Sequence, residues 1–268
     1  MAELGVFQGP PFRLVTLSTH ALYFVNNPSM ALDAAVNTTS TLIQGVESSY
    51  PSAARHAPWI LQYRLYRDTI PPTTPTNDAN GKPKPFAHTL QHLLHLSSLH
   101  PSRTYICVQP PTGLGTVTAI PHRQQEPLAS LLRHQFTALW QPRHFLSVQQ
   151  GVTYTAGICT VQIGELRVTR EGPQASGPQS PGVFVCISTI IGGDDVEESA
   201  GVLAAEDEED MDLEYAQAIV RDCWSRIKAN RDFGKSEIRE VMMTSDNLKK
   251  HPKEAAVRMW CEGLRLRS

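Results

Sequence analysis

Two glycines, Gly113 and Gly115 in the stretch PPTGLGTVTAIP, are the first residues of this 268-residue sequence that could do chemistry. Glycine-rich turns bind phosphate when a helix begins directly after them, because the free N–H groups of its first turn point at the anion. Here β-branched residues and then Pro121 follow the glycines, and no lysine accompanies them. We therefore expect the pair to form a turn between two strands and to bind no nucleotide.

Three histidines, His88, His92 and His95, are spaced so that on a helix they would share one face and could bind a metal ion. The apolar, β-leaning residues around them indicate a strand instead. On a strand His88 and His92 share a face, and His95 points away from it. No cysteine or acidic residue close by in the sequence completes a ligand set. We therefore expect neither a metal site nor a cofactor.

Carboxylates that alternate along the inward face of a β-barrel could hold a divalent metal. The predicted strands are almost free of acidic residues: Glu165 is the one carboxylate in CTVQIGELRVTR, and VFVCISTII has none. No GxSxG motif and no local Ser/His/Asp or Cys/His grouping is present. We predict no catalytic residue. A barrel enzyme or ligand-binding protein that uses its interior remains the alternative hypothesis.

The charge of the chain is unevenly distributed. Residues 194–214 hold 11 of the 26 acidic residues and no lysine or arginine, which leaves 15 acidic and 24 basic residues elsewhere. Dense like charge with little apolar content cannot repay the entropy of ordering, so we expect a mobile loop over residues 194–211. Basic residues near the C-terminus are interrupted by acidic ones, which is typical of a solvated helix face and predicts no direct nucleic-acid binding. They are Lys249, Lys250, Lys253, Arg258, Arg265 and Arg267.

The five cysteines predict buried, reduced thiols, because they are odd in number, never form a CxxC pair and lie among apolar residues. The N-terminal residues lack the basic segment and apolar core of a secretory signal. No apolar run reaches the ~20 residues needed to cross a bilayer. We expect a cytosolic or nuclear protein without membrane contact.

Hydrophobic periodicity predicts the elements that must carry these residues. Helices are expected at 28–48, 126–140, 213–230 and 252–267. Strands are expected at 3–8, 59–68, 88–99, 103–109, 115–120, 144–150, 152–157, 159–170 and 183–191. Runs of consecutive strands followed by helices indicate an α+β fold with an antiparallel sheet, closed into a β-barrel because long free edges invite aggregation. We expect one domain over residues 1–268, with inserted loops at about 69–86, 171–182 and 192–211.

The strand 59–68 offers a candidate partner surface. One face holds four large apolar residues that we assign to the core: Trp59, Leu61, Tyr63 and Leu65. The other face carries Ile60, Arg64 and Tyr66, which we expect to be exposed and to bind a partner, because aromatic residues and arginine dominate binding hot spots. The alternative is that Tyr66 only packs on the loop that follows the strand.

The segment 134–168, HQFTALWQPRHFLSVQQGVTYTAGICTVQIGELRV, resembles the central part of the Mediator of RNA polymerase II transcription subunit 20 family. That family runs a helix into a G–x–x–Y/L strand and then into a V–x–hydrophobic–G–x–L strand. The matching positions here are Gly151, Tyr154, Val161, Ile163, Gly164 and Leu166. The stretches ELGVFQGPP and SDNL followed by AAVRMWCEGLRLR are similar to the two ends of the family. The resemblance covers most of the chain, and the departures from it are the Pro-rich loop 69–86 and the acidic stretch 194–214.

The resemblance implies a non-enzymatic β-barrel protein with flanking helices, in the nucleus. It implies pairing with Mediator subunit 18 in the head module, with subunit 8 joined through subunit 18, and support of transcription initiation by RNA polymerase II with a link to the TATA-binding protein. Aliphatic inward positions such as Val161 and Ile163 without a cavity would favour such an assembly subunit. A polar pocket lined by histidines or acids would favour the barrel enzyme or ligand-binding protein.

Overall fold

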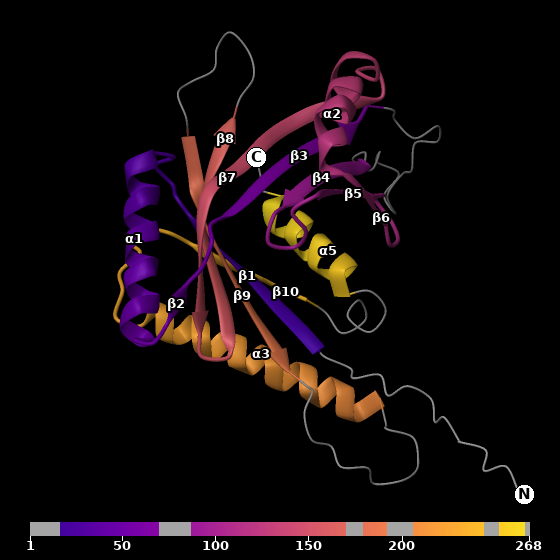
Figure 1. Ribbon diagram of the computed structural model, residues 1–268. Coiled ribbons are helices and arrows are strands. Elements are labelled where there is room, and N and C mark those ends of the chain that lie inside the picture. Colours follow the sequence, from indigo (N-terminus) through magenta and orange to yellow (C-terminus); the bar gives the residue numbers. More distant parts are fainter. Residues whose placement is uncertain (1–16, 70–86, 170–178, 192–205, 244–251, 266–268) are drawn as a thin grey trace, which may run out of the picture.

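The computed structural model describes residues 17–69, 87–169, 179–191, 206–243 and 252–265 (Figure 1). Its helices are α1 (Leu32–Ser49), α2 (Gln125–His134), α3 (Glu206–Lys228), α5 (Pro252–Leu264) and the short 3-10 helix η1 (His122–Gln124). Its strands are β1 (Leu17–Asn26), β2 (Ala54–Arg55), β3 (Trp59–Asp68), β4 (Leu90–Leu96), β5 (Arg103–Gln109), β6 (Thr116–Pro121), β7 (Trp140–Ala156), β8 (Cys159–Thr169), β9 (Gln179–Ile191) and β10 (Ile238–Met242). The α+β class is confirmed.

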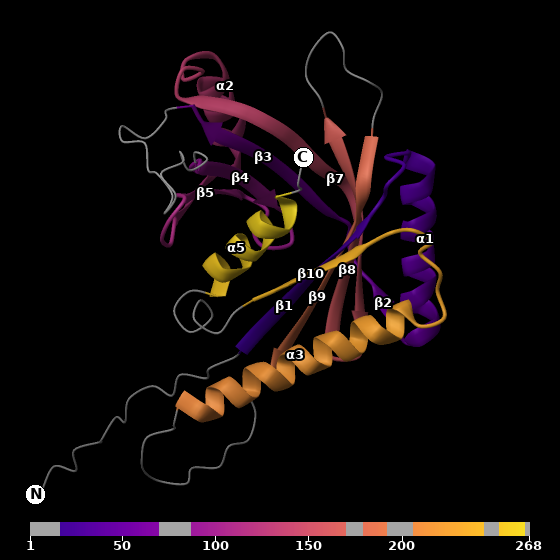
Figure 2. The same ribbon diagram turned by 180° about the vertical axis from the view of Figure 1, so that it is seen from behind.

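The strands form one antiparallel sheet in the order β10-β1-β9-β8-β7-β3-β4-β5-β6, with β2 paired to β7. The expected closed barrel is not confirmed, because no ladder joins β10 to β6 among the described strands. The sheet curls instead, and α5 lies within the curl (Figures 1 and 2). This helix contacts β1 and β10 on one side and β4 and β5 on the other. Its side chains thus occupy the space between the two ends of the sheet.

The hydrophobic core inside the curl is centred on α5. Trp260 of this helix lies with its ring centroid 5.9 Å from that of Trp59 and 5.7 Å from that of Phe184. The predicted core face of β3 belongs to the same cluster, so that assignment is confirmed. Burial of such large rings is the strongest single source of packing energy in a core of this kind.

A second hydrophobic core lies on the opposite face of the sheet, under α1 and α3 (Figure 1). There Tyr23 of β1 stacks on Trp224 of α3, with ring centroids 4.5 Å apart. Val161 and Ile163 are fully buried in this second core. We expected them to point into a barrel interior, and the structure corrects this: they face α1 and α3, because the residues of β8 that face α5 are Gly164 and Leu166.

The structure corrects several element boundaries. The helix expected to reach residue 140 ends at His134, and one 17-residue strand, β7, starts at Trp140 where two short strands were expected. The strand β9 starts at Gln179, inside the expected loop 171–182. The helix α3 starts at Glu206, so the expected acidic loop ends before residue 211.

Two strands at one edge of the sheet, β1 and β10, were not predicted at all. The expected strand 3–8 lies outside the described residues, as do 70–86 and 192–205 of the expected loops. The five cysteines are buried and free of disulfides, as predicted. Within the described part of the chain, no helix combines the length and the apolar character needed to cross a membrane.

Candidate partner interface

The glycine pair of the sequence forms a turn, as predicted. Gly113, at φ +87°, and Gly115 lie between β5 and β6, whose antiparallel pairing places Val108 opposite Thr116. A strand and not a helix follows the glycines. The arrangement in which a helix begins directly after the glycines, which binds phosphate, is therefore not formed at this turn.

The three histidines lie in or beside the strand β4 and go to three different surroundings. His88 pairs with Asp68 at 2.8 Å, and His92 lies inside the curl with its Nδ1 atom 2.8 Å from the hydroxyl oxygen of Tyr63. His95 points to the other face and stacks on His122, with ring centroids 3.7 Å apart. No group of three or more His, Cys, Asp or Glu side chains that could hold a metal ion is found among the described residues.

Burial controls the ionisation of the Tyr63–His92 pair. It lowers the pKa of His92 to about 4 and raises the pKa of Tyr63 well above its ordinary value. Both side chains are therefore neutral at pH 7, and the tyrosine hydroxyl can donate to the unprotonated Nδ1 atom. The Nε2 atom of His92 is buried and has no hydrogen-bond partner among the described residues. With both groups neutral at pH 7, the pair resembles a polar contact in a core more than a general acid or base poised near neutral pH.

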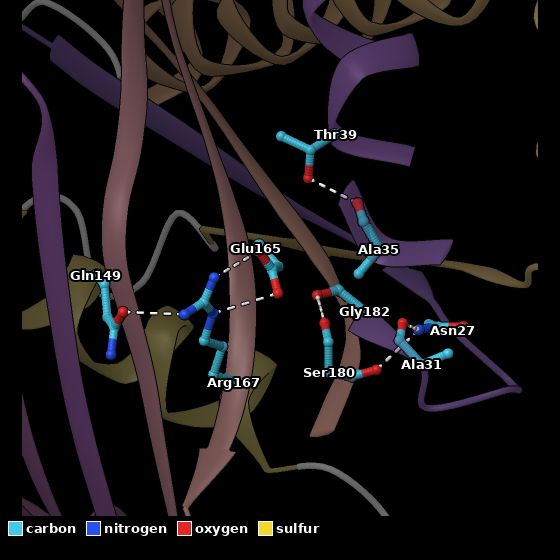
Figure 3. Close-up of polar contacts among 9 residues, drawn as sticks. All are labelled: Asn27, Ala31, Ala35, Thr39, Gln149, Glu165, Arg167, Ser180 and Gly182. Carbon is cyan, nitrogen blue, oxygen red and sulfur yellow. Dashed lines mark hydrogen bonds and ion pairs between the residues drawn. The ribbon is translucent and has the colours of Figure 1, made fainter. Parts of the chain in front are cut away.

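Glu165, the carboxylate singled out on the predicted strands, lies on β8 with its side chain on the α1 side of the sheet (Figure 3). Both of its oxygens accept hydrogen bonds from Arg167 at 3.3 Å, and Arg167 also donates to Gln149 at 3.0 Å. The carboxylate is thus held in a side-chain network on the face opposite α5. It does not point into the curl.

The outward face of β3 is covered along most of its length. Ile60 is exposed at 42%, as expected, but Arg64 and Tyr66 are buried, at 8% and 1%. The expectation that all three are exposed is therefore wrong for two of them. The alternation of the strand is correct, but α2 packs on this face and Tyr66 forms a small core with Leu93 and residues of the helix. Sequence periodicity defines two faces of a strand, and it does not say which of them another element covers.

Arg64 fastens α2 to the sheet. Its Nη2 atom donates to both carboxylate oxygens of Glu126, at 2.7 and 3.0 Å, and its guanidinium carbon lies 4.9 Å from the ring centroid of Phe145. Glu126 lies in the first turn of α2, where a carboxylate is also favoured by the helix dipole. The side chain of Arg64 is thus held between Phe145 of β7 and Glu126 of α2.

A hydrogen-bonded chain of side chains fixes the beginning of the same helix. Thr104 of β5 donates to Gln125 at 2.8 Å, and Gln125 donates to Gln62 of β3 at 2.9 Å. The hydroxyl of Thr104 also lies 3.1 Å from the Nδ1 atom of His122. Together with the Arg64–Glu126 pair, these bonds give α2 a defined position on β3, β4 and β5.

The far end of α2 presents an apolar surface that we call the α2 tip, formed by Leu131, Phe136 and Leu139. These side chains are exposed at 36%, 39% and 39%. Their backbones are joined, because the N–H of Phe136 donates to the carbonyl of Leu131 and that of Leu139 donates to the carbonyl of Phe136. An exposed apolar cluster on a rigid support is typical of a protein interaction site. The sequence signal was present, but we assigned these residues to the buried stripe of one longer helix.

Comparison with solved structures finds chains of similar fold, among them two of low sequence identity that are covered over most of their length. The PH1819 protein from Pyrococcus horikoshii OT3 has 13% identity and a TM-score of 0.33, with 78% of this chain and 90% of that chain covered. A chain of the Schizosaccharomyces pombe Mediator head module has 11% identity and a TM-score of 0.36, with 81% and 97% covered.

No curated protein matches the sequence. A family model does match it, over residues 24–254, and this family is described as the TATA-binding related factor (TRF) of subunit 20 of the Mediator complex. The match runs from the end of β1 to the first turn of α5 and includes the strands from β2 to β10. The chain therefore belongs to the Mediator subunit 20 family, as the resemblance in its central strands predicted.

Proposed function

We propose that this chain is a non-enzymatic subunit of the Mediator head module, acting in the nucleus in transcription initiation by RNA polymerase II. The observation that carries the proposal is the family match over residues 24–254. The filling of the curl by α5 supports it, since most of the sheet interior is packed with side chains. Such a protein works through its surface, by holding other subunits in place.

Its direct partner in this proposal is Mediator subunit 18, with subunit 8 joined through subunit 18. Contacts with the TATA-binding protein and with RNA polymerase II would follow from membership of the same module. The α2 tip is the surface that we assign to the partner, because it is apolar, exposed and held firmly by the sheet. Arg64 and Tyr66 support this surface indirectly, because they fix α2 on the sheet. Ile60 is exposed and lies beyond the start of the helix.

The experiment is co-expression of the chain with subunit 18 of the same organism, followed by a measurement of mass in solution. A one-to-one complex supports the proposal. Two separate species under conditions in which both proteins are folded contradict it.

The interface is tested with the double substitution Phe136→Ser and Leu139→Ser. Loss of a buried aromatic anchor commonly costs ~2 kcal/mol of binding free energy, so we expect affinity for subunit 18 to fall by more than tenfold. The matched control is Val36→Ser on α1, which removes an aliphatic side chain that is exposed at 47%. The control should bind like the wild type. Equal affinity of the wild type and both variants for subunit 18 would show that the interface lies outside the α2 tip. It would not contradict the pairing with subunit 18.

A further inference from the structure

A cavity of about 820 Å³ opens at the end of the curl, where β3, β4 and β5 approach the last turn of α5 and the strand β10. Its lining is unusually basic. Four arginines contribute to it, against one carboxylate, that of Glu262. They are Arg67, Arg143, Arg239 and Arg265. His88 also lines the cavity, but it is paired with Asp68. A concave site lined by one sign of charge concentrates the field of that charge and attracts the opposite one.

Two of these arginines are held in place by hydrogen bonds from their Nη2 atoms. Arg67 donates through Nη2 to Gln141 at 2.9 Å, and Arg239 donates through Nη2 to the carbonyl oxygens of Glu262 and Gly263 at the end of α5. In both side chains the Nε atom is buried and has no hydrogen-bond partner among the described residues, and neither guanidinium pairs with a carboxylate among them. The positive charges thus lie in fixed positions at the cavity, where a bound anion would compensate them without the entropy cost of ordering the side chains.

The remainder of the lining is apolar and includes Leu65, Leu90, Pro110 and Pro111. A free polyphosphate would leave this apolar surface unused. Carboxylate side chains separated by apolar ones would use both parts of the lining, because a planar guanidinium binds a carboxylate through two parallel hydrogen bonds. The size of the cavity suits a few residues of peptide.

We propose that this cavity binds an acidic peptide segment of a partner protein, with carboxylates on Arg67, Arg239 and Arg265 and an apolar side chain against Leu65 and Pro110. The site lies on the concave side of the sheet, whereas the α2 tip rises from its outward face. The inference therefore does not depend on pairing with subunit 18. It also differs from an enzyme site, since the basic side chains bind a charge and transfer no group.

The probe for this site is a fluorescein-labelled peptide of about ten residues that repeats Glu-Ala-Glu-Leu, with a Gln-Ala-Gln-Leu peptide as its uncharged counterpart. We expect the acidic peptide to bind the full chain, with an affinity that falls as salt rises, and the uncharged peptide to bind at least tenfold more weakly. Equal binding of both peptides would overturn the proposal. So would tight binding of tripolyphosphate together with failure of the acidic peptide, because the site would then serve a free phosphate anion.

The location is tested with the double substitution Arg67→Ala and Arg265→Ala, which should weaken binding of the acidic peptide by tenfold or more. The matched control is Arg221→Ala with Arg226→Ala on α3, where the side chains are ion-paired and exposed at 56% and 61%. The control removes the same charge from another face and should leave binding unchanged. An equal loss of peptide binding in both variants would show that the peptide responds only to net charge, and it would overturn the proposed site. If the cavity variant fails to fold, hydrogen exchange of the wild type decides: protection by the peptide at the ends of β3 and α5 supports the site, and protection confined elsewhere contradicts it.

Discussion

The indole ring of Trp59 lies directly against the backbone of Gly151 in the neighbouring strand β7. A Cβ atom on Gly151 would lie 2.3 Å from the Cε2 atom of the ring, and one on Gly164 of β8 would lie 2.6 Å from its Cζ2 atom. The Nε1 atom of Trp59 donates to the carbonyl of Val152 at 3.1 Å. The β3–β7 ladder shifts its register beside Trp59, and the β7–β8 ladder shifts between Ser147 and Val152. One large ring thus lies across two glycines where the sheet bends, which gives a physical reason for both glycines of the family pattern.

We predict that Gly151→Ala destabilises the protein. Alanine would normally be the better residue in a strand, but here its methyl group would overlap the indole, and overpacking of this kind costs about 1–3 kcal/mol. Urea denaturation measures the loss. In a Trp59→Phe background the smaller ring leaves room for the methyl group, so the same substitution should cost clearly less. An equal cost in both backgrounds would show that Trp59 is not the obstacle.

The parts of the fold that could be predicted from the sequence are the elements whose large apolar residues recur at a regular spacing along one face. The strand β3 and the helices α1, α3 and α5 show a clear period, and each was placed within a few residues on at least one side. The strand β1 was missed because both of its faces are buried, one against α5 and one against α3, so its residues 21–25 form a continuous apolar run. A continuous apolar run of this kind cannot be told from a helix segment by its period.

The candidate site was only partly predictable for the same reason. The pattern of β3 correctly separated Tyr63 from Arg64, but the burial of Arg64 depends on Glu126, which lies about sixty residues later in the chain. Closure of the sheet was wrongly expected because α5, the last helix of the sequence, enters the curl between the sheet ends. Contacts between distant segments leave no local trace in a single sequence.

Arg64 gives the second prediction. An exposed Arg64 and Tyr66 would have allowed double substitution by alanine at little cost in stability, with the loss confined to partner binding. Because both residues are buried, we instead expect their substitution to lower the stability of the protein. We expect Arg64→Ala to lower the free energy of unfolding by about 2 kcal/mol, since it removes the packing on Phe145 and the anchor of α2 together.

The matched variant is Arg64→Met, which keeps most of the packing and removes the charge. Arg64 has two buried nitrogens, Nε and Nη1, without a hydrogen-bond partner among the described residues, and Glu126 is 69% exposed and can be solvated by water. Replacement of such a pair by an apolar side chain is often close to neutral, so we expect a change within about 1 kcal/mol. Chemical denaturation of the two variants side by side is the measurement. Equal destabilisation by Ala and Met would assign the stabilising effect to the charge instead of the packing.

The third prediction concerns pH and the buried pair of His92 and Tyr63. The pKa of His92 is lowered to about 4 in the folded protein, against about 6.5 when unfolded, so between these values the unfolded chain binds a proton that the folded one does not. Stability is therefore full above pH 6.5 and is lost as the pH falls toward 4. From pH 7 to pH 5 this single histidine should account for a loss of about 2 kcal/mol.

The substitution His92→Asn tests this assignment, because the amide oxygen still accepts from the hydroxyl of Tyr63 and does not titrate. The variant should lose less free energy of unfolding between pH 7 and pH 5 than the wild type does, whatever its stability at pH 7. His20, whose pKa burial also lowers to about 4, should account for a similar share, so the slope is reduced and not abolished. Identical pH profiles of the wild type and the variant would contradict the prediction.

The last prediction concerns the acidic segment, which the sequence led us to expect as a mobile loop over residues 194–211. Because α3 begins at Glu206, we make separate predictions for residues 194–205 and for residues 206–211. Replacement of residues 194–205 by a Gly/Ser linker of equal length should leave the melting temperature within a few degrees, since this stretch carries four acidic residues and has no basic and no aromatic residue. Replacement that continues through residue 211 should lower it further, because glycine inside a helix costs about 1 kcal/mol per residue relative to alanine. Thermal denaturation followed by circular dichroism compares the two chains. If the shorter replacement already causes a large loss, residues 194–205 are packed against the fold and the expectation of a dispensable loop is wrong.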